Sequence, residues 1–141
     1  DGIHLPKHLL QFVSKFKGAD KTALSTDAMR GAGMPDGESI LGSLTNGQKV
    51  IIEDGVAKLP DRSAFAGSVA TADRLVRTMI NIAGIPLIDA IRMITLTPAR
   101  ILHVDSQKGS LEEGKDADIV IFDNQINVTT TISKGHVIYN Q

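Results

Sequence analysis

The chain has 141 residues, with 15 Lys and Arg against 16 Asp and Glu and a formal net charge of −1. This balance gives no bulk electrostatic reason to expect a nucleic-acid or membrane partner, so small or neutral partners are favoured. Apolar residues make up 42% of the chain and cysteine is absent, which predicts one domain-sized globular piece without disulfides or thiolate metal sites, and the cytoplasm as its compartment.

The first segment predicts a strand, a helix and a second strand in succession. Apolar residues recur at helical spacing over 7–17 and Gly18 follows them, so a helix is expected there. Short apolar segments at Ile3 and over 22–26 are interpreted as strands, and this order is the unit of a parallel sheet. Because the chain opens on what resembles the end of a strand, without an initial Met, we expect the natural polypeptide to begin upstream.

Asp27 follows the second predicted strand and precedes a glycine-rich loop over residues 31–37. A carboxylate at this position lies at the rim of a sheet, where α/β proteins bind ligands and carry out their chemistry. Asp27 is therefore the first candidate for a catalytic residue. The alternative is that its side-chain oxygen caps the next segment, as Asp commonly does.

A β-hairpin is predicted in the glycine-rich middle of the chain. Apolar or alternating residues occupy 48–53 and 56–59, and Asp54-Gly55 stands between them. An Asp-Gly pair in this setting is a strong hairpin signal. We interpret it as an antiparallel excursion at about 38–60, which is either a lid over a site or a surface hairpin without a function.

Helical periodicity returns over residues 71–83 and 87–96. Ser68 and Thr71 are alternative candidate caps for the first of these helices. Small residues before a helix leave backbone N–H groups that can meet an anion, although ordinary capping explains them equally well. Thr97 is expected to cap a further turn with Pro98 at its first helical position.

The last third of the chain is expected to consist of strands and turns. A turn-rich link over 108–116 precedes segments with strand composition at 117–123, 128–133 and 137–139. β-Branched residues such as those of the second segment favour strands. Helices thus give way to strands near residue 104, which we take as a domain boundary.

Several short motifs spread over the whole chain are similar to those of one enzyme family. They are Asp1-Gly2-Ile3-His4, Thr26-Asp27-Ala28-Met29 with Ala32-Gly33, Ala66-Gly67-Ser68, Thr97-Pro98-Ala99-Arg100, and the run from Gly109 to Asp118. Many amidohydrolases share the last motif, whereas the combination of the first three is more specific. On these residues the chain resembles the C-terminal part of the N-acetylglucosamine-6-phosphate deacetylase family, within the amidohydrolase superfamily.

The resemblance implies an α/β fold, namely the C-terminal part of a metal-dependent (β/α)8 TIM-like barrel together with strands of a small β-sandwich. Residues 1–104 would form the barrel portion, with the hairpin excursion at about 38–60, and residues 105–141 would supply the sandwich strands. The last two barrel strands would end at His4 and Asp27, so that both side chains face the active site.

The reaction implied by the resemblance is hydrolysis of N-acetylglucosamine 6-phosphate to glucosamine 6-phosphate and acetate, in amino-sugar catabolism. Asp27 would accept a proton from the attacking water and pass it to the leaving amine. His4 would contact the phosphosugar. Phe65, Ala66 and Gly67 would form part of the sugar or acetamido pocket, with Phe65 in place of the more usual aliphatic residue.

The resemblance also implies a divalent metal, zinc or another ion, and a homodimer. The family's metal ligands, a Glu and two His, come from earlier barrel strands. Nothing in this chain replaces them, because His8 falls on a predicted helix while His103 and His136 fall in the boundary and sandwich regions. We therefore expect the chain to supply no metal ligands and to be inactive alone.

Two other hypotheses remain open. In the first, the intact protein is another amidohydrolase, for example one acting on a cyclic amide. In the second, the chain is a non-catalytic α/β module that binds a sugar phosphate or a protein through its loop over 31–37. A dependence on phosphorylated substrates separates the deacetylase from the first alternative. Saturable binding that needs no metal supports the second, and a purely structural role is the default if no ligand binds.

Overall fold

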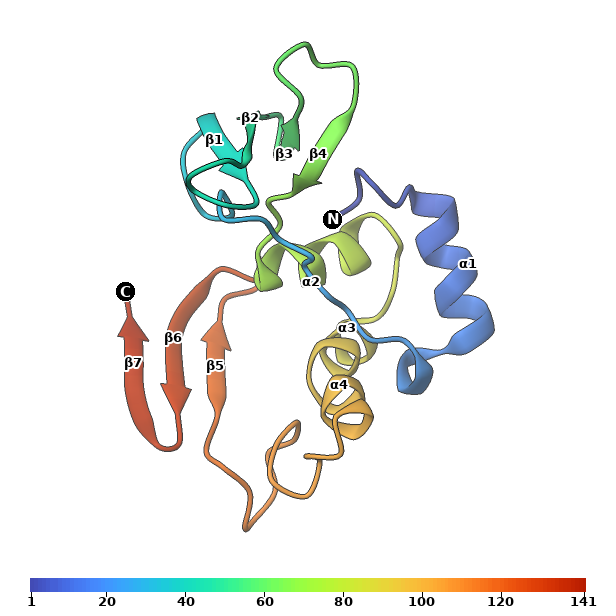
Figure 1. Cartoon of the computed structure of the whole chain (residues 1–141). Helices are drawn as coiled ribbons and strands as arrows, with labels where there is room; N and C mark the ends of the chain where they lie inside the picture. Colours follow the sequence, from blue (N-terminus) through green and yellow to red (C-terminus); the bar gives the residue numbers. More distant parts are fainter. The chain divides into compact units, whose positions relative to one another are not determined.

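A computed structural model of the chain describes all of residues 1–141, which form two compact units. The first unit comprises Asp1–Pro6 and Ser25–Leu75, and the second comprises Lys7–Leu24 and Val76–Gln141. None of the helices combines the length and the apolar character needed to cross a membrane. The elements in chain order (Figure 1) are α1 (Lys7–Lys17), η1 (Ala19–Lys21), β1 (Gly37–Leu41), β2 (Gln48–Glu53), β3 (Val56–Lys58), β4 (Phe65–Ser68), α2 (Ala72–Asn81), α3 (Leu87–Ile94), α4 (Leu96–Ile101), β5 (Ile119–Phe122), β6 (Val128–Ser133) and β7 (His136–Asn140).

The first unit is built on a four-stranded antiparallel sheet whose strands pair in chain order, β1 to β4 (Figure 1). The predicted hairpin is present as β2 and β3. Asp54 and Gly55 between them have φ values of 54° and 72°, the positive values that a tight hairpin turn requires. Alternation along β2 buries Val50 and Ile52, which are 1% and 3% exposed, so this face of the strand enters the core.

The sheet is larger than the sequence predicted, because β1 and β4 extend the hairpin on both sides. The segment Phe65–Ser68 forms strand β4. Ser68 does not cap α2, since its hydroxyl accepts a hydrogen bond from the Ala70 N–H at 3.1 Å. Short segments that contain glycine carry a weak strand signal on their own, and these two become strands by pairing with the hairpin.

The predicted parallel strands at Ile3 and over 22–26 are not formed. Both sheets of the chain are antiparallel, and the single parallel contact is an isolated bridge between Ala28 and Ser68. A strand requires a neighbouring strand to satisfy its backbone groups. In segment 22–26 the Leu24 N–H bonds to a helix and not to a strand: it donates to the Met93 carbonyl of α3 at 2.9 Å.

The helices of the second unit largely follow the prediction. α1 has the predicted bounds, and α3 ends at Ile94 rather than at Leu96. α4 begins at Leu96, so Pro98 occupies its third position and not its first. First-turn N–H groups have no acceptor within a helix, so proline costs little there. Thr97 is not the cap, because it is 1% exposed inside α4 and its hydroxyl donates to the Ala19 carbonyl at 2.7 Å.

A buried cluster forms the core of the second unit. Its members are Val76, Met79, Ala83, Ala90, Met93 and Ile126. Ile126 lies in the connection between β5 and β6, and its carbonyl accepts a hydrogen bond from Arg77 Nη1 at 2.8 Å, so the β5–β6–β7 sheet is tied to the helices of this unit. β6 has the predicted bounds. The division at residue 104 into barrel and sandwich portions stays a prediction.

Candidate active site

Asp27 lies beside the C-terminal end of β4. The Met29 N–H donates to the Ser68 carbonyl at 2.9 Å, and Ala28 forms its bridge with the same residue. Asp27 has a φ of 44°, a conformation that Asp tolerates better than most other residues. Its carboxylate is exposed and makes no hydrogen bond within the chain. Asp27 therefore does not cap the following turn.

His4 lies against the opposite end of β4. Its ring contacts the ring of Phe65 in an edge arrangement, with centroids 5.2 Å apart and planes at 60°. Phe65 and Ser68 are the two ends of β4. A strand rises about 3.4 Å per residue, so His4 and Asp27 meet β4 at points roughly 10 Å apart along it. The five predicted site residues thus lie on or beside one short strand.

Met29 holds the loop after Asp27 on the sheet. Met29 is 9% exposed, and its Sδ accepts a hydrogen bond from the Gly31 N–H at 3.0 Å. It belongs to the buried cluster of the first unit, whose members are Met29, Val50, Ile52, Ala57 and Val69. A Cβ atom added to Gly31 would lie 2.2 Å from Cδ1 of Ile52 and 2.9 Å from the Met29 sulfur. A side chain at position 31 would therefore have to displace the ends of the Ile52 and Met29 side chains.

Replacing Gly31 with Ala is expected to lower the free energy of unfolding by about 2 kcal/mol, the usual cost of overpacking. Because the new Cβ meets Cδ1 of Ile52, the variant Ile52→Val, which lacks that atom, provides a rescue. Ile52→Val alone should cost about 1 kcal/mol, and the double variant should lose less than the sum of the two single variants. Urea denaturation of the four proteins measures this, and strictly additive losses would contradict the contact.

Asp1 and Arg74 support His4 and were not predicted from the sequence. The Asp1 side chain is 4% exposed, its Oδ1 accepts the N–H groups of Ile3 and His4 at 3.0 and 2.9 Å, and its Oδ2 lies 2.5 Å from His4 Nδ1. Arg74 donates to the Asp1 carbonyl at 3.5 Å and to the Gly55 carbonyl at 2.7 Å. An Asp that bonds N–H groups two or three residues ahead is a local turn signal, which would have identified Asp1. Arg74 gives no such signal, because its partners are distant in sequence.

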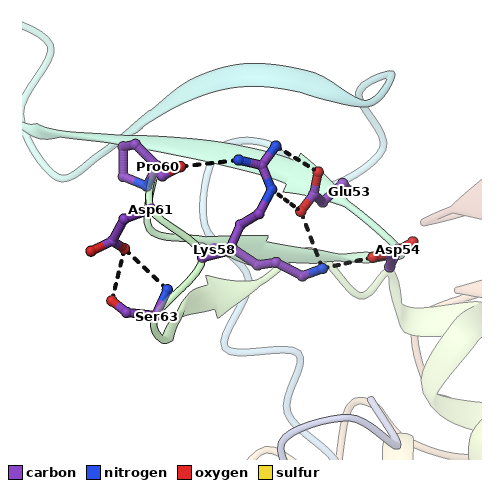
Figure 2. A network of polar contacts seen from close by, with 7 residues as sticks. Glu53, Asp54, Lys58, Pro60, Asp61 and Ser63 are labelled. Atoms are coloured by element: carbon purple, nitrogen blue, oxygen red, sulfur yellow. Dashed lines mark hydrogen bonds and ion pairs between the residues drawn. The ribbon is translucent and has the colours of Figure 1, made fainter.

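A network of paired charges covers the β2–β3 hairpin (Figure 2). Lys58 donates to Glu53 at 3.2 Å and to Asp54 at 2.6 Å, and Arg62 donates to both carboxylate oxygens of Glu53 at 2.9 and 3.2 Å. Hydrogen bonds from Arg62 and then Lys58 hold the pKa of Glu53 below its usual value, and the bond to Asp54 raises the pKa of Lys58. A neighbouring cavity of about 480 Å³ is lined by Lys58, Arg62, Ser63, Ala64 and Phe65. Both of its cations are already paired, so the cavity does not present a free positive charge.

No group of three or more His, Asp or Glu side chains in the chain is placed to hold a metal ion. The one histidine of the candidate site, His4, has its Nδ1 bonded to Asp1. The residues of this chain therefore do not by themselves fit the divalent metal that the family resemblance implies.

Almost the whole chain, residues 2–138, matches a model of the amidohydrolase family. The chain belongs to the amidohydrolase family. This match confirms the superfamily to which the sequence motifs pointed. The matched region includes Asp27, His4 and β4.

Individual amidohydrolases show the same likeness. The N-acetylglucosamine-6-phosphate deacetylase of Lysinibacillus sphaericus is 39% identical over 137 residues, which cover 97% of this chain and 34% of the relative. A putative N-acetylgalactosamine-6-phosphate deacetylase of Escherichia coli K12 is 39% identical over 118 residues, or 84% of this chain and 68% of the relative. This chain thus spans about a third of the first relative's length.

A solved amidohydrolase structure extends the likeness to the fold. A mutant N-acetyl-D-glucosamine-6-phosphate deacetylase of Mycobacterium smegmatis, in complex with N-acetyl-D-glucosamine-6-phosphate, has a TM-score of 0.87 and 28% identity, covering 99% of this chain and 36% of that chain. The match confirms the predicted fold class, an α/β portion of an amidohydrolase barrel with strands of a small sandwich.

Proposed function

We propose that the protein carrying this chain is a metal-dependent deacetylase that hydrolyses N-acetylglucosamine 6-phosphate to glucosamine 6-phosphate and acetate. The observation that carries the proposal is the exposed carboxylate of Asp27, which makes no hydrogen bond within the chain and lies beside β4. His4 contacts the same strand at Phe65. The substrate class is supported by the name of the Lysinibacillus relative and by the phosphosugar bound in the mycobacterial structure.

Asp27 has the free carboxylate that a general acid–base step needs. In the proposed reaction a water oxygen bonds to the acetyl carbon and the bond from that carbon to nitrogen breaks. Asp27 accepts a proton from the water and delivers it to the leaving nitrogen, so that acetate and the free amine are formed. Because the carboxylate makes no hydrogen bond within the chain, no internal contact has to break before it accepts the proton.

β4 and His4 are proposed to hold the sugar. Phe65 is 51% exposed, and its ring can cover an apolar face of the substrate. Ala66 and Gly67 follow Phe65 along β4 and are half-buried, with Ala66 packed on the buried cluster and Gly67 against Met29, so their proposed contribution to the pocket comes from the family resemblance. His4 adds a ring nitrogen that has no partner within the chain, which is a suitable hydrogen-bonding group for a hydroxyl or an anionic oxygen.

The proposal includes a divalent ion, zinc or another, held by ligands outside these 141 residues. We further propose that the intact enzyme is a homodimer and acts in the cytoplasm. The family resemblance supports the metal and the dimer. The net charge of −1 supports small molecules, and not nucleic acid or membrane, as the partners.

A chimera tests the proposed reaction. Residues 1–141 replace the matching region of the Lysinibacillus relative, and acetate release is measured with a divalent metal present. The substrates are N-acetylglucosamine 6-phosphate and its unphosphorylated counterpart. We expect turnover of the phosphorylated sugar and much slower turnover of the other, because a site built to bind a charged group leaves its ligands unpaired when that group is missing.

The name of the E. coli relative favours a second candidate substrate, the 4-epimer N-acetylgalactosamine 6-phosphate. The ratio of kcat/KM for the two phosphosugars in the chimera decides between them. A folded, metal-loaded chimera that hydrolyses neither phosphosugar would contradict the deacetylase. Turnover of a cyclic amide would then favour the other amidohydrolase hypothesis, and metal-independent binding without turnover would favour the binding module.

A further inference from the structure

One nitrogen of the His4 ring, Nδ1, is bonded to Asp1, and the other, Nε2, has no partner within the chain. We infer that Asp1 is a positioning residue: it fixes His4 in the tautomer with the hydrogen on Nδ1 and holds the ring so that Nε2 faces the substrate. This inference rests on the proposed role of His4 in substrate binding.

The Asp1 carboxylate is a buried acceptor surrounded by three donors. It is 4% exposed, and it accepts the N–H groups of Ile3 and His4 on Oδ1 and the His4 ring on Oδ2. An ionised carboxylate accepts hydrogen bonds and cannot donate them, so Nδ1 must carry the hydrogen of this 2.5 Å pair. In the neutral ring Nε2 is then the acceptor.

Phe65 supplies the second restraint on the ring. Its edge contact at a centroid distance of 5.2 Å limits rotation of the imidazole about the bond to Asp1. The His4 side chain remains 35% exposed, and Nε2 has no partner within the chain. A neutral Nε2 accepts a hydrogen bond from a sugar hydroxyl, and the imidazolium form donates from the same atom to an anionic oxygen.

The turn that carries Asp1 is itself tied to the sheet. Arg74 donates to the Asp1 carbonyl at 3.5 Å and to the Gly55 carbonyl, in the turn between β2 and β3, at 2.7 Å. Since Phe65 belongs to the same sheet, the two groups that restrain His4 are positioned by one framework. Such outer contacts commonly decide which histidine nitrogen is available for function.

Nitrogen-15 NMR of the assigned His4, His103 and His136 rings in the folded chimera tests the inference, at a pH where the histidines are neutral. His4 is expected to carry its hydrogen on Nδ1. His103 and His136, which are exposed and unbonded, should favour the Nε2–H tautomer of a free side chain. Asp1→Ala should lose the His4 preference. Asp1→Asn should lose it too, because an amide oxygen that keeps the two N–H bonds of Asp1 leaves an NH2 donor, not an acceptor, facing Nδ1. Asp36→Ala, at an exposed acid of the same unit, is the matched control and should change nothing.

An Nε2–H tautomer of His4 in the unmodified, folded chimera would overturn the inference, and this measurement does not depend on how any variant folds. So would an unchanged Nδ1–H tautomer in an Asp1→Ala chain that keeps the contact between His4 and Phe65. The tautomer is measured without substrate or metal. Failure of the chimera to release acetate would therefore leave this result standing, and failure here would leave the reaction assay valid.

Discussion

Substitution of Asp27 by Asn in the chimera is expected to slow acetate release by a factor of about 10²–10⁴, the usual contribution of a positioned general acid–base group. Asn has nearly the same shape, but its amide does not take the water proton and return it to the amine. The Asp27 carboxylate makes no hydrogen bond within the chain, so the free energy of unfolding should stay nearly constant. Single-turnover acetate release and urea denaturation measure the two quantities separately.

Asp36 provides the matched control for this substitution. It is an exposed acid in the same glycine-rich loop and lies outside β4 and its contacts. Asp36→Asn should release acetate at the rate of the unmodified chimera. If Asp27→Asn also kept a rate within a few-fold of normal, Asp27 would have no part in proton transfer and the proposed mechanism would fail.

Gly109→Ala is expected to lower the free energy of unfolding by about 3 kcal/mol, from a close contact and a strained backbone together. Gly109 has a φ of 90°. An added Cβ would lie 2.7 Å from the Ala99 Cβ, 3.0 Å from the Leu96 Cα and 3.1 Å from the Thr95 carbonyl oxygen. Two of these atoms belong to the backbone and cannot move aside without shifting the start of α4. Urea denaturation of the 141-residue chain measures the loss.

Gly114 separates the two causes. Its φ is 88°, close to that of Gly109, but an added Cβ would have no neighbour within 4 Å. Gly114→Ala should therefore cost about 1 kcal/mol, from the positive φ alone. Equal losses for the two variants would show that the approach of Gly109 to α4 has no energetic consequence, contrary to the geometry.

The elements predicted correctly are those whose signals are local. α1 follows from helical periodicity, β2 and β3 follow from two short segments around Asp54-Gly55, and β6 follows from its β-branched residues. The segment 22–26 has the composition of a strand but no strand beside it, and pairing is a property of the whole chain that composition does not encode. β1 and β4 show the converse, because the neighbouring hairpin makes strands of segments with weak propensity of their own.

The candidate site was predictable in part. Asp27 stood out by its place between an apolar segment and a glycine-rich loop, whereas His4, Phe65, Ala66 and Gly67 were proposed from the family resemblance. Their gathering along β4 depends on contacts between residues distant in sequence, such as His4 with Phe65, and no local pattern specifies them. The strand interpretation of the first residues concealed the turn in which Asp1 binds His4.

The chain order of β1 to β4 has a consequence for how the site assembles. Every pairing in this sheet joins strands that follow each other directly, so the loops closed during its formation are short and their entropic cost is small. His4 and Asp27 must instead be brought to β4 across much longer stretches of chain. The sheet is therefore expected to form first, as a local nucleus, and to capture the residues proposed for catalysis and binding afterwards.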